Sequence, residues 1–139
     1  MSESSLILVV DDNDGGLLLA TAVLQREGFR VDSAGSAEDV RKRLTARLPD
    51  LILMDVQLPG QDGLSLTRQL RADPATAAIP IVALTAHAMA SDREDAFAAG
   101  CVGYISKPID TRTLGDLVRR FLTAAATGRE AFHLPPPER

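Results

Sequence analysis

The sequence has no tryptophan, a single cysteine and few aromatic residues, which make up 4% of the chain. The core must therefore be built from aliphatic side chains. Cys101 has no second cysteine to pair with, so the chain can form no internal disulfide. Its position between Gly100 and Val102 predicts a small buried hydrophobic residue rather than a nucleophile.

Long apolar runs are also absent. No run approaches the ~18 residues of a membrane span, and residues 1–5 lack the apolar stretch of a signal peptide. A cytoplasmic protein with no membrane partner is expected. The net charge is −4 and basic residues form no extended cluster, so no nucleic-acid partner is expected either.

The 139 residues suit one domain, and apolar runs of strand length alternate in it with helical patterns. Continuous apolar runs are typical of strands covered on both faces of a parallel sheet. The predicted strands are 6–10, 29–34, 51–54, 79–84 and 102–105, and the predicted helices are 16–27, 37–48, 63–72, 88–99 and 112–126. This alternation predicts an α/β fold, a doubly wound parallel sheet of five strands with five helices.

The alternating part defines a domain over residues 6–126, after an N-terminal extension at 1–5. Residues 127–139 contain "LPPPER", and three successive prolines cannot continue a helix. We expect a flexible proline-rich tail and no output domain after it. If the chain is a fragment, this tail is instead the start of a linker.

In doubly wound sheets, ligands bind beyond the carboxyl ends of the strands. Strand two ends in the chemically plain Ser33-Ala34, which suits an edge position in the order 2-1-3-4-5. The other four strands each end in a charged or hydroxyl-bearing side chain: Asp11 and Asp12, Asp55, Thr85 and Lys107. These side chains are expected to meet at one edge of the sheet.

Three carboxylates in one pocket need compensation. Two of them ~5 Å apart repel by about 3 kcal/mol at an effective dielectric constant of ~20. Lys107 can offset one charge, and a divalent cation can offset the rest. Oxygen ligands without histidine or cysteine favour Mg²⁺, which also recruits phosphate oxygens. A carboxylate beside Mg²⁺, a lysine and a hydroxyl is suited to phosphoryl transfer onto an aspartate.

Four motifs together resemble those of CheY-like receiver domains of bacterial response regulators: "VVDDN", "DLILMDVQLPGQDG", "IPIVALTA" and "GYISKPI". The resemblance covers about residues 6–126 and is greatest with single-domain receivers of the DivK type and receivers of hybrid kinases. It implies a flavodoxin-like sheet in the order 2-1-3-4-5. It also implies a regulator that receives a phosphoryl group from a histidine kinase or histidine phosphotransfer protein.

The resemblance implies a role for each acidic residue. Asp55 would be the phosphoacceptor. Asp12, Asp55 and the backbone carbonyl of Gln57 would bind Mg²⁺ directly, and Asp11 would hold it through water.

The same resemblance implies a switch. Lys107 would pair with the phosphoryl oxygens, and Thr85 would hydrogen-bond the phosphoryl group. Tyr104 would turn inward as Thr85 moves, changing the surface of the fourth helix, fifth strand and fifth helix that binds the downstream protein. The bond between Lys107 and Pro108 is expected to be cis.

Other interpretations remain open. Asp11 and Asp12 could merely cap the first helix, and Tyr104 could be plain edge-strand packing. A phosphatase of the haloacid-dehalogenase type also uses an aspartyl phosphate, but it usually needs a second acid where this chain has Gln57. A pseudo-receiver that binds partners without phosphorylation is the remaining alternative. We expect a signalling domain rather than an enzyme.

One departure from the family pattern is Gly15-Gly16 at the start of the first helix, where related sequences often carry a polar residue. Glycine costs a helix interior about 1 kcal/mol and its end less, so the rigidity beside Asp12 is in question. His87, two residues after Thr85, is either a residue that tunes dephosphorylation or a plain loop residue.

Overall fold

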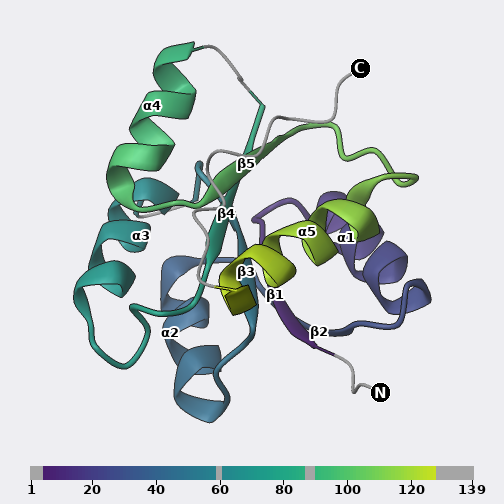
Figure 1. Ribbon diagram of the computed structural model, residues 1–139, viewed down its shortest axis with the longest axis horizontal. Helices are drawn as coiled ribbons and strands as arrows, with labels where there is room; N and C mark the ends of the chain where they lie inside the picture. Colours follow the sequence, from purple (N-terminus) through teal and green to yellow (C-terminus); the bar gives the residue numbers. More distant parts are fainter. Residues whose placement is uncertain (1–4, 59–60, 87–89, 128–139) are drawn as a thin grey trace.

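The structure is a computed structural model, which describes residues 5–58, 61–86 and 90–127. Its centre is a parallel sheet of five strands in the order β2-β1-β3-β4-β5, as predicted (Figure 1). The strands are β1 (Leu6–Val10), β2 (Arg30–Ala34), β3 (Leu51–Asp55), β4 (Ile81–Thr85) and β5 (Gly103–Ser106). The sheet is the flavodoxin-like, doubly wound α/β arrangement.

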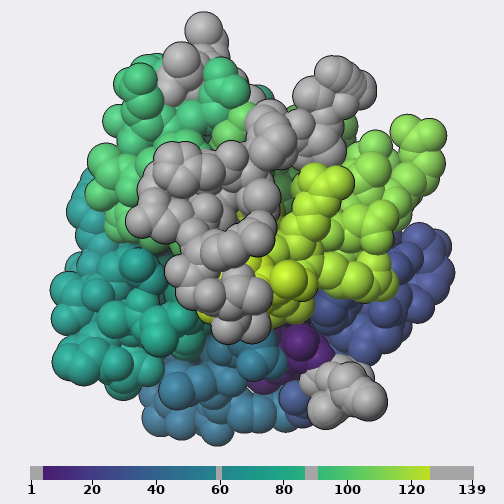
Figure 2. Space-filling view, viewed as in Figure 1, coloured from purple at the N-terminus to yellow at the C-terminus, as the bar shows by residue number. Residues whose placement is uncertain are grey.

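Five helices cover the two faces of this sheet. They are α1 (Asp14–Arg26), α2 (Ala37–Ala46), α3 (Gly63–Ala72), α4 (Ala90–Ala99) and α5 (Leu114–Thr127). Helices α1 and α5 lie on one face, and α2, α3 and α4 lie on the other (Figure 1). In the space-filling view α3 and α4 form the left side of the molecule and α1 the right (Figure 2).

Each face of the sheet has its own aliphatic core. Alternate residues of a strand point to opposite faces, so Ile7 and Val9 pack under α1 and α5, whereas Leu8 and Val10 pack under α2 and α3. All five residues of β1, β3 and β4 are buried, because helices cover these strands on both sides. This explains the continuous apolar runs in the sequence. Cys101 is buried and free, as predicted.

Polar caps and glycines set the helix ends. The side chains of Asn13, Ser36 and Asp62 accept backbone N–H bonds at the starts of α1, α2 and α3. Gly28 and Gly100 follow α1 and α4 with φ of 98° and 112°, a conformation that favours glycine at a helix end.

Two boundaries predicted beside prolines were wrong by two residues. Helix α2 ends at Ala46, not at residue 48, because the residue before Pro49 is disfavoured in the helical region. Strand β4 begins at Ile81, not at residue 79. The Ile79 N–H bonds back to the Thr76 carbonyl in a turn, and Pro80 has no N–H for the ladder.

The predicted starts of two helices, at residues 16 and 112, were also wrong by two residues. Helix α1 begins at Asp14 because Asn13 is its cap. Residues 111–113 form a turn before α5, in which the Leu114 N–H bonds to the Asp110 carbonyl. The tail was predicted at 127–139, but Thr127 is the last residue of α5. The rest of the predicted tail, residues 128–139, and His87 lie outside the described residues. In the described ranges, every helix is too short or too polar to cross a bilayer.

Candidate functional site

The carboxyl ends of β1, β3, β4 and β5 bring the predicted site residues to one edge of the sheet. The register aligns these ends, since Asp55 pairs with Leu84 and Thr85 pairs with Ser106. Asp11 follows β1 directly, Asp55 and Thr85 are the last residues of β3 and β4, and Lys107 follows β5. Four strands far apart in sequence thus supply one site.

Lys107 lies between two buried carboxylates. Its Nζ is 3.1 Å from Oδ2 of Asp55 and 3.4 Å from Oδ2 of Asp11. Backbone N–H groups hold the other oxygen of each: Gln57 N donates to Asp55 Oδ1 at 3.0 Å, and Asn13 N donates to Asp11 Oδ1 at 2.9 Å. Each carboxylate is therefore fixed in orientation, with one oxygen facing Lys107 and the other accepting a backbone N–H.

The charges of this group are coupled. Burial raises the pKa of Asp55, and the hydrogen bonds from the Gln57 N–H and from Lys107 offset only part of that rise. Burial lowers the pKa of Lys107, but the hydrogen bonds and charges of Asp55 and Asp11 outweigh it, leaving the pKa above its ordinary value. The lysine stays cationic at neutral pH, and one ammonium faces two carboxylates.

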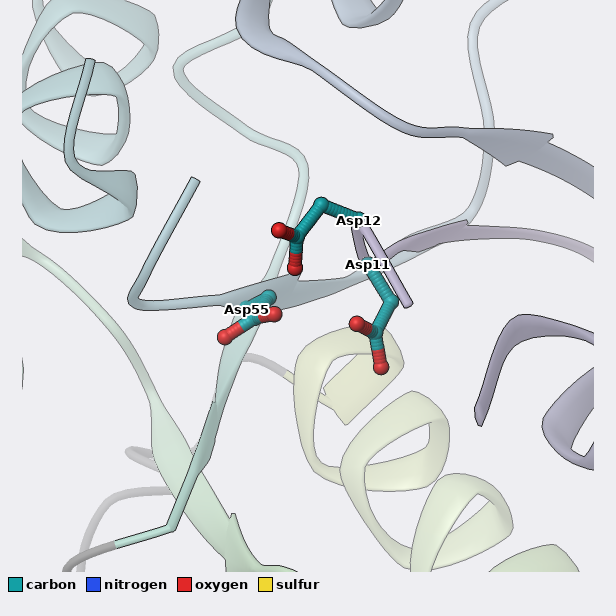
Figure 3. A group of neighbouring side chains, drawn as sticks. All are labelled: Asp11, Asp12 and Asp55. Carbon is teal, nitrogen blue, oxygen red and sulfur yellow. The ribbon is translucent and has the colours of Figure 1, made fainter. Parts of the chain in front are cut away.

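Asp12 adds a third carboxylate to the cluster. Unlike Asp11 and Asp55 it is exposed, and one oxygen from each of the three carboxylates lies within 4.8 Å of the others. Figure 3 shows Asp11 and Asp12 coming from the segment after β1, and Asp55 coming from β3 beside them. An acidic cluster with one open side is thus present.

The donor set of this cluster fits Mg²⁺. All three donors are carboxylate oxygens, the ligands that Mg²⁺ prefers, and the exposed side leaves room for the water molecules that it retains. Two direct ligands of one Mg²⁺ lie at most ~4.2 Å apart at ~2.1 Å each. The spread of up to 4.8 Å therefore suits an ion that meets part of the cluster directly and part through water.

Helix α1 does not use Asp11 or Asp12 as its cap. Asn13 Oδ1 accepts the Gly16 N–H at 2.8 Å and caps the helix instead. The two aspartates are therefore available to the cluster, which answers the alternative that they only cap α1.

Two glycines allow the close packing around the site, and sequence reasoning did not assign them this role. A β-carbon on Gly16 would lie 2.9 Å from Asp11 Oδ2, and one on Gly63 would lie 2.0 Å from the Asp55 carbonyl oxygen. Gly16 lets α1 start against the Asp11 carboxylate, and Gly63 lets α3 start against the end of β3. For Gly16, the pair of glycines at the start of a predicted helix was the feature of the sequence that could have indicated this role.

Thr85 and Tyr104 lie on neighbouring strands. Thr85 is buried, and its carbonyl accepts the Lys107 N–H at 2.8 Å. Tyr104 is half-buried on β5 and packs against the core under α2, α3 and α4. The Lys107–Pro108 bond is cis, as expected.

A cleft of about 420 Å³ opens beside the cluster. Polar Asp11, Asn13 and Lys107 line one part of it, and apolar residues line the rest, among them Leu19, Ala86, Pro108 and Ile109. On α1, Leu18 is 67% exposed and Leu19 43% exposed. The acidic cluster is thus reached from a surface that carries exposed apolar side chains.

Comparison with known proteins identifies a related group. The model of the response regulator receiver domain family matches residues 7–119. The chain is 34% identical to the polar-differentiation response regulator DivK of Brucella ovis over 84% of this chain and 94% of DivK. It is 38% identical to the sensor protein GacS of Pseudomonas syringae over 99% of this chain, but over only 15% of GacS.

A solved structure has the same fold. The chemotaxis response regulator CheY4 of Vibrio cholerae superposes with a TM-score of 0.81 at 24% identity, covering 86% of this chain and 99% of CheY4. Among the curated relatives, coverage of the whole relative varies widely. The chain spans between 15% and 57% of the length of four of them.

Proposed function

The chain belongs to the response regulator receiver domain family, and on this basis we propose that Asp55 accepts a phosphoryl group in two-component signalling. Proteins of this family are signalling modules that work with histidine kinases or phosphotransfer proteins. The observation that carries the proposal is the position of Lys107, whose Nζ lies 3.1 Å and 3.4 Å from carboxylates on two separate strands. The similarity to DivK supports a regulator that acts as a receiver by itself.

The donor is a phosphohistidine of a histidine kinase or histidine phosphotransfer protein. An Asp55 carboxylate oxygen attacks the phosphorus in line, an acyl phosphate P–O bond forms, and the P–N bond to the imidazole breaks. The released imidazole nitrogen takes up a proton. The exposed side of the cluster, where Asp12 lies, is the direction from which a donor can approach.

The residues around Asp55 have separate tasks in this step. The Gln57 N–H holds one Asp55 oxygen, so that the carboxylate keeps one orientation. Lys107 can move its hydrogen bonds from the carboxylate to the phosphoryl oxygens, and its elevated pKa keeps it cationic. Thr85, which is buried at the end of β4, would hydrogen-bond the phosphoryl group.

Asp12, Asp55 and the backbone carbonyl of Gln57 would hold Mg²⁺ directly, and Asp11 would hold it through water. When bound, the ion neutralises the cluster and the phosphoryl oxygens. Without it, three carboxylates face one ammonium, and an incoming phosphoryl group is repelled. We therefore expect phosphorylation to require a divalent cation.

The output is a change of protein surface. Thr85 closes on the phosphoryl group and Tyr104 follows it, so the face formed by α4, β5 and α5 changes and binds a downstream protein. Hydrolysis of the acyl phosphate resets this face. The position two residues after Asp55 carries exposed Gln57 and not an acid, which argues against a haloacid-dehalogenase phosphatase.

The test is phosphorylation with acetyl phosphate and Mg²⁺, read as the mass of the intact protein. Wild type should gain one phosphoryl group, and Asp55→Asn should gain none. Asp14→Asn is the matched control, because it removes the same charge from an exposed position on α1. Equal labelling of wild type and Asp55→Asn would refute the assignment.

A further inference from the structure

The cationic side chain of Arg93 on α4 contacts Tyr104 on β5 and holds it in place. Arg93 Nη1 donates a hydrogen bond to the Tyr104 hydroxyl oxygen at 2.9 Å. The guanidinium carbon of the same arginine lies 5.4 Å from the centre of the tyrosine ring. One side chain thus contacts both the polar tip and the face of Tyr104, and both contacts are stronger for a cation than for a neutral donor.

Phe97, one turn further along α4, completes this contact. Its ring meets the Tyr104 ring edge to face, with the centroids 6.3 Å apart and the planes at 67°. Arg93 and Tyr104 are both half-buried, so water only partly screens the contact. Tyr104 therefore has a defined position against α4.

The strand register places this tyrosine beside Thr85. Ala83 pairs with Tyr104 and Thr85 pairs with Ser106. Alternate residues of a strand share a face, so Thr85 and Tyr104 share the sheet face that α3 and α4 cover. In the proposed switch the tyrosine ring would move along this face towards Thr85 and give up the hydrogen bond from Arg93.

We propose that Arg93 is a positioning residue that holds Tyr104 against α4 while Asp55 is unphosphorylated, and so sets how readily the signalling face changes. This inference rests on the proposed function. A contact made in only one of two conformations shifts the equilibrium towards that conformation by its own free energy. Loss of the guanidinium should therefore shift Tyr104, even in the unphosphorylated protein, towards the position that it takes when Asp55 is phosphorylated.

The composition of the chain allows a direct measurement. Tyr104 is the only tyrosine and the chain has no tryptophan, so 3-fluorotyrosine labelling gives a single ¹⁹F probe at this position. The resonance is recorded for wild type before and after phosphorylation with acetyl phosphate and Mg²⁺. These two values define the end points of the switch.

The informative variant is Arg93→Met, which keeps an unbranched apolar stem and removes the charge. Without phosphorylation, its resonance should lie between the two wild-type end points, with the ratio of the two conformations changed by roughly threefold to tenfold. Arg68→Met is the matched control, since it removes an exposed guanidinium from α3 and should leave the resonance at the wild-type value. Arg93→Lys, which keeps a cation, should restore part of the wild-type position.

The inference is overturned if unphosphorylated Arg93→Met has the wild-type resonance while wild type itself responds to phosphorylation. An equal shift in Arg93→Met and Arg68→Met also overturns it, because the effect is then one of net charge. Thermal unfolding of both variants checks that they are folded. A wild-type protein that gains no phosphoryl mass is a different result, which refutes the proposed function and with it the role of Arg93.

Discussion

Gly16 and Asp11 lie so close that a β-carbon on the glycine would be 2.9 Å from Oδ2 of the carboxylate. That oxygen is the one facing Lys107 Nζ. The glycine in the first turn of α1 is therefore a means of placing the carboxylate, whose other oxygen accepts the Asn13 N–H. The weak helix start predicted from Gly15-Gly16 has a structural reason.

Gly16→Ala should accordingly impair the cluster although alanine favours helices. The added methyl group pushes a buried carboxylate away from Lys107, and we predict an affinity for Mg²⁺ lower by roughly threefold or more, equivalent to about 0.7 kcal/mol. Gly15→Ala is the control, because its β-carbon would meet only the Asn13 side chain, at 3.3 Å. The melting temperature, recorded at increasing Mg²⁺ concentrations, measures the Mg²⁺ affinity of both variants. Equal Mg²⁺ affinity in the two variants would show that Gly16 has no such role.

Mg²⁺ should stabilise the folded protein through Asp12. A ligand that binds only the folded state at ten times its Kd adds about 1.4 kcal/mol to the free energy of unfolding. Asp12 is exposed, so Asp12→Asn should change the metal-free stability little but remove most of the Mg²⁺-dependent gain. Asp14, on α1, is also exposed, and Asp14→Asn should retain the Mg²⁺-dependent gain. Calorimetry with and without Mg²⁺ distinguishes these outcomes, and full Mg²⁺ stabilisation of Asp12→Asn would exclude Asp12 as a ligand.

Asp55→Asn should be more stable than wild type at neutral pH without divalent cations. Burial raises the pKa of Asp55 above its ordinary value of 3.8, so its ionisation costs the folded protein stability as pH rises through the window above 3.8. The cost grows as the pH rises through the raised pKa of Asp55, and at pH 7 we predict a melting temperature higher by roughly 2–5 °C in the variant.

Lowering the pH towards 3.8 should narrow this gap, because the raised pKa lets the folded protein bind the Asp55 proton first, while the unfolded chain is half protonated at pH 3.8. Asp14→Asn reports the effect of net charge alone. Circular dichroism melts at pH 7 and near pH 4 measure the difference. A gap that widened on acidification would mean that the pKa of Asp55 is lowered by its neighbours.

Gly63→Ala should destabilise the fold strongly. Its β-carbon would lie 2.0 Å from the Asp55 carbonyl oxygen and 2.9 Å from the carbonyl carbon. Both atoms belong to the backbone and cannot rotate away, so α3 must shift, at a cost of roughly 3 kcal/mol or more. Gly115→Ala is the matched case, because its β-carbon would meet the Glu27 side chain at 2.7 Å, which can move. Urea unfolding should give Gly63→Ala a much lower free energy of unfolding than Gly115→Ala. Equal free energies would contradict the close approach of Gly63 to the Asp55 backbone.

Local sequence patterns predicted the buried strands and Asp55 but misplaced the end of α2. The apolar runs at 6–10 and 51–54 identified β1 and β3 because strands buried on both faces need apolar side chains throughout. Asp55 was foreseen at the site because a charge after such a run is too costly to bury without partners. The end of α2 was misplaced because the amphipathic pattern continues to Leu48, while Pro49 restricts the backbone before it.

By itself, the sequence determined the alternation of strands and helices and the polar side chains that end the strands, because periodicity and backbone topology are local properties. The parallel direction of the strands then dictates that these ends share one edge, and the strand order decides which ends are neighbours. Only the tertiary structure decided that Gly16 touches Asp11 and that Arg93 holds Tyr104. Such contacts depend on how far and at what angle one element packs on another, and the spacing of residues along the chain does not specify that.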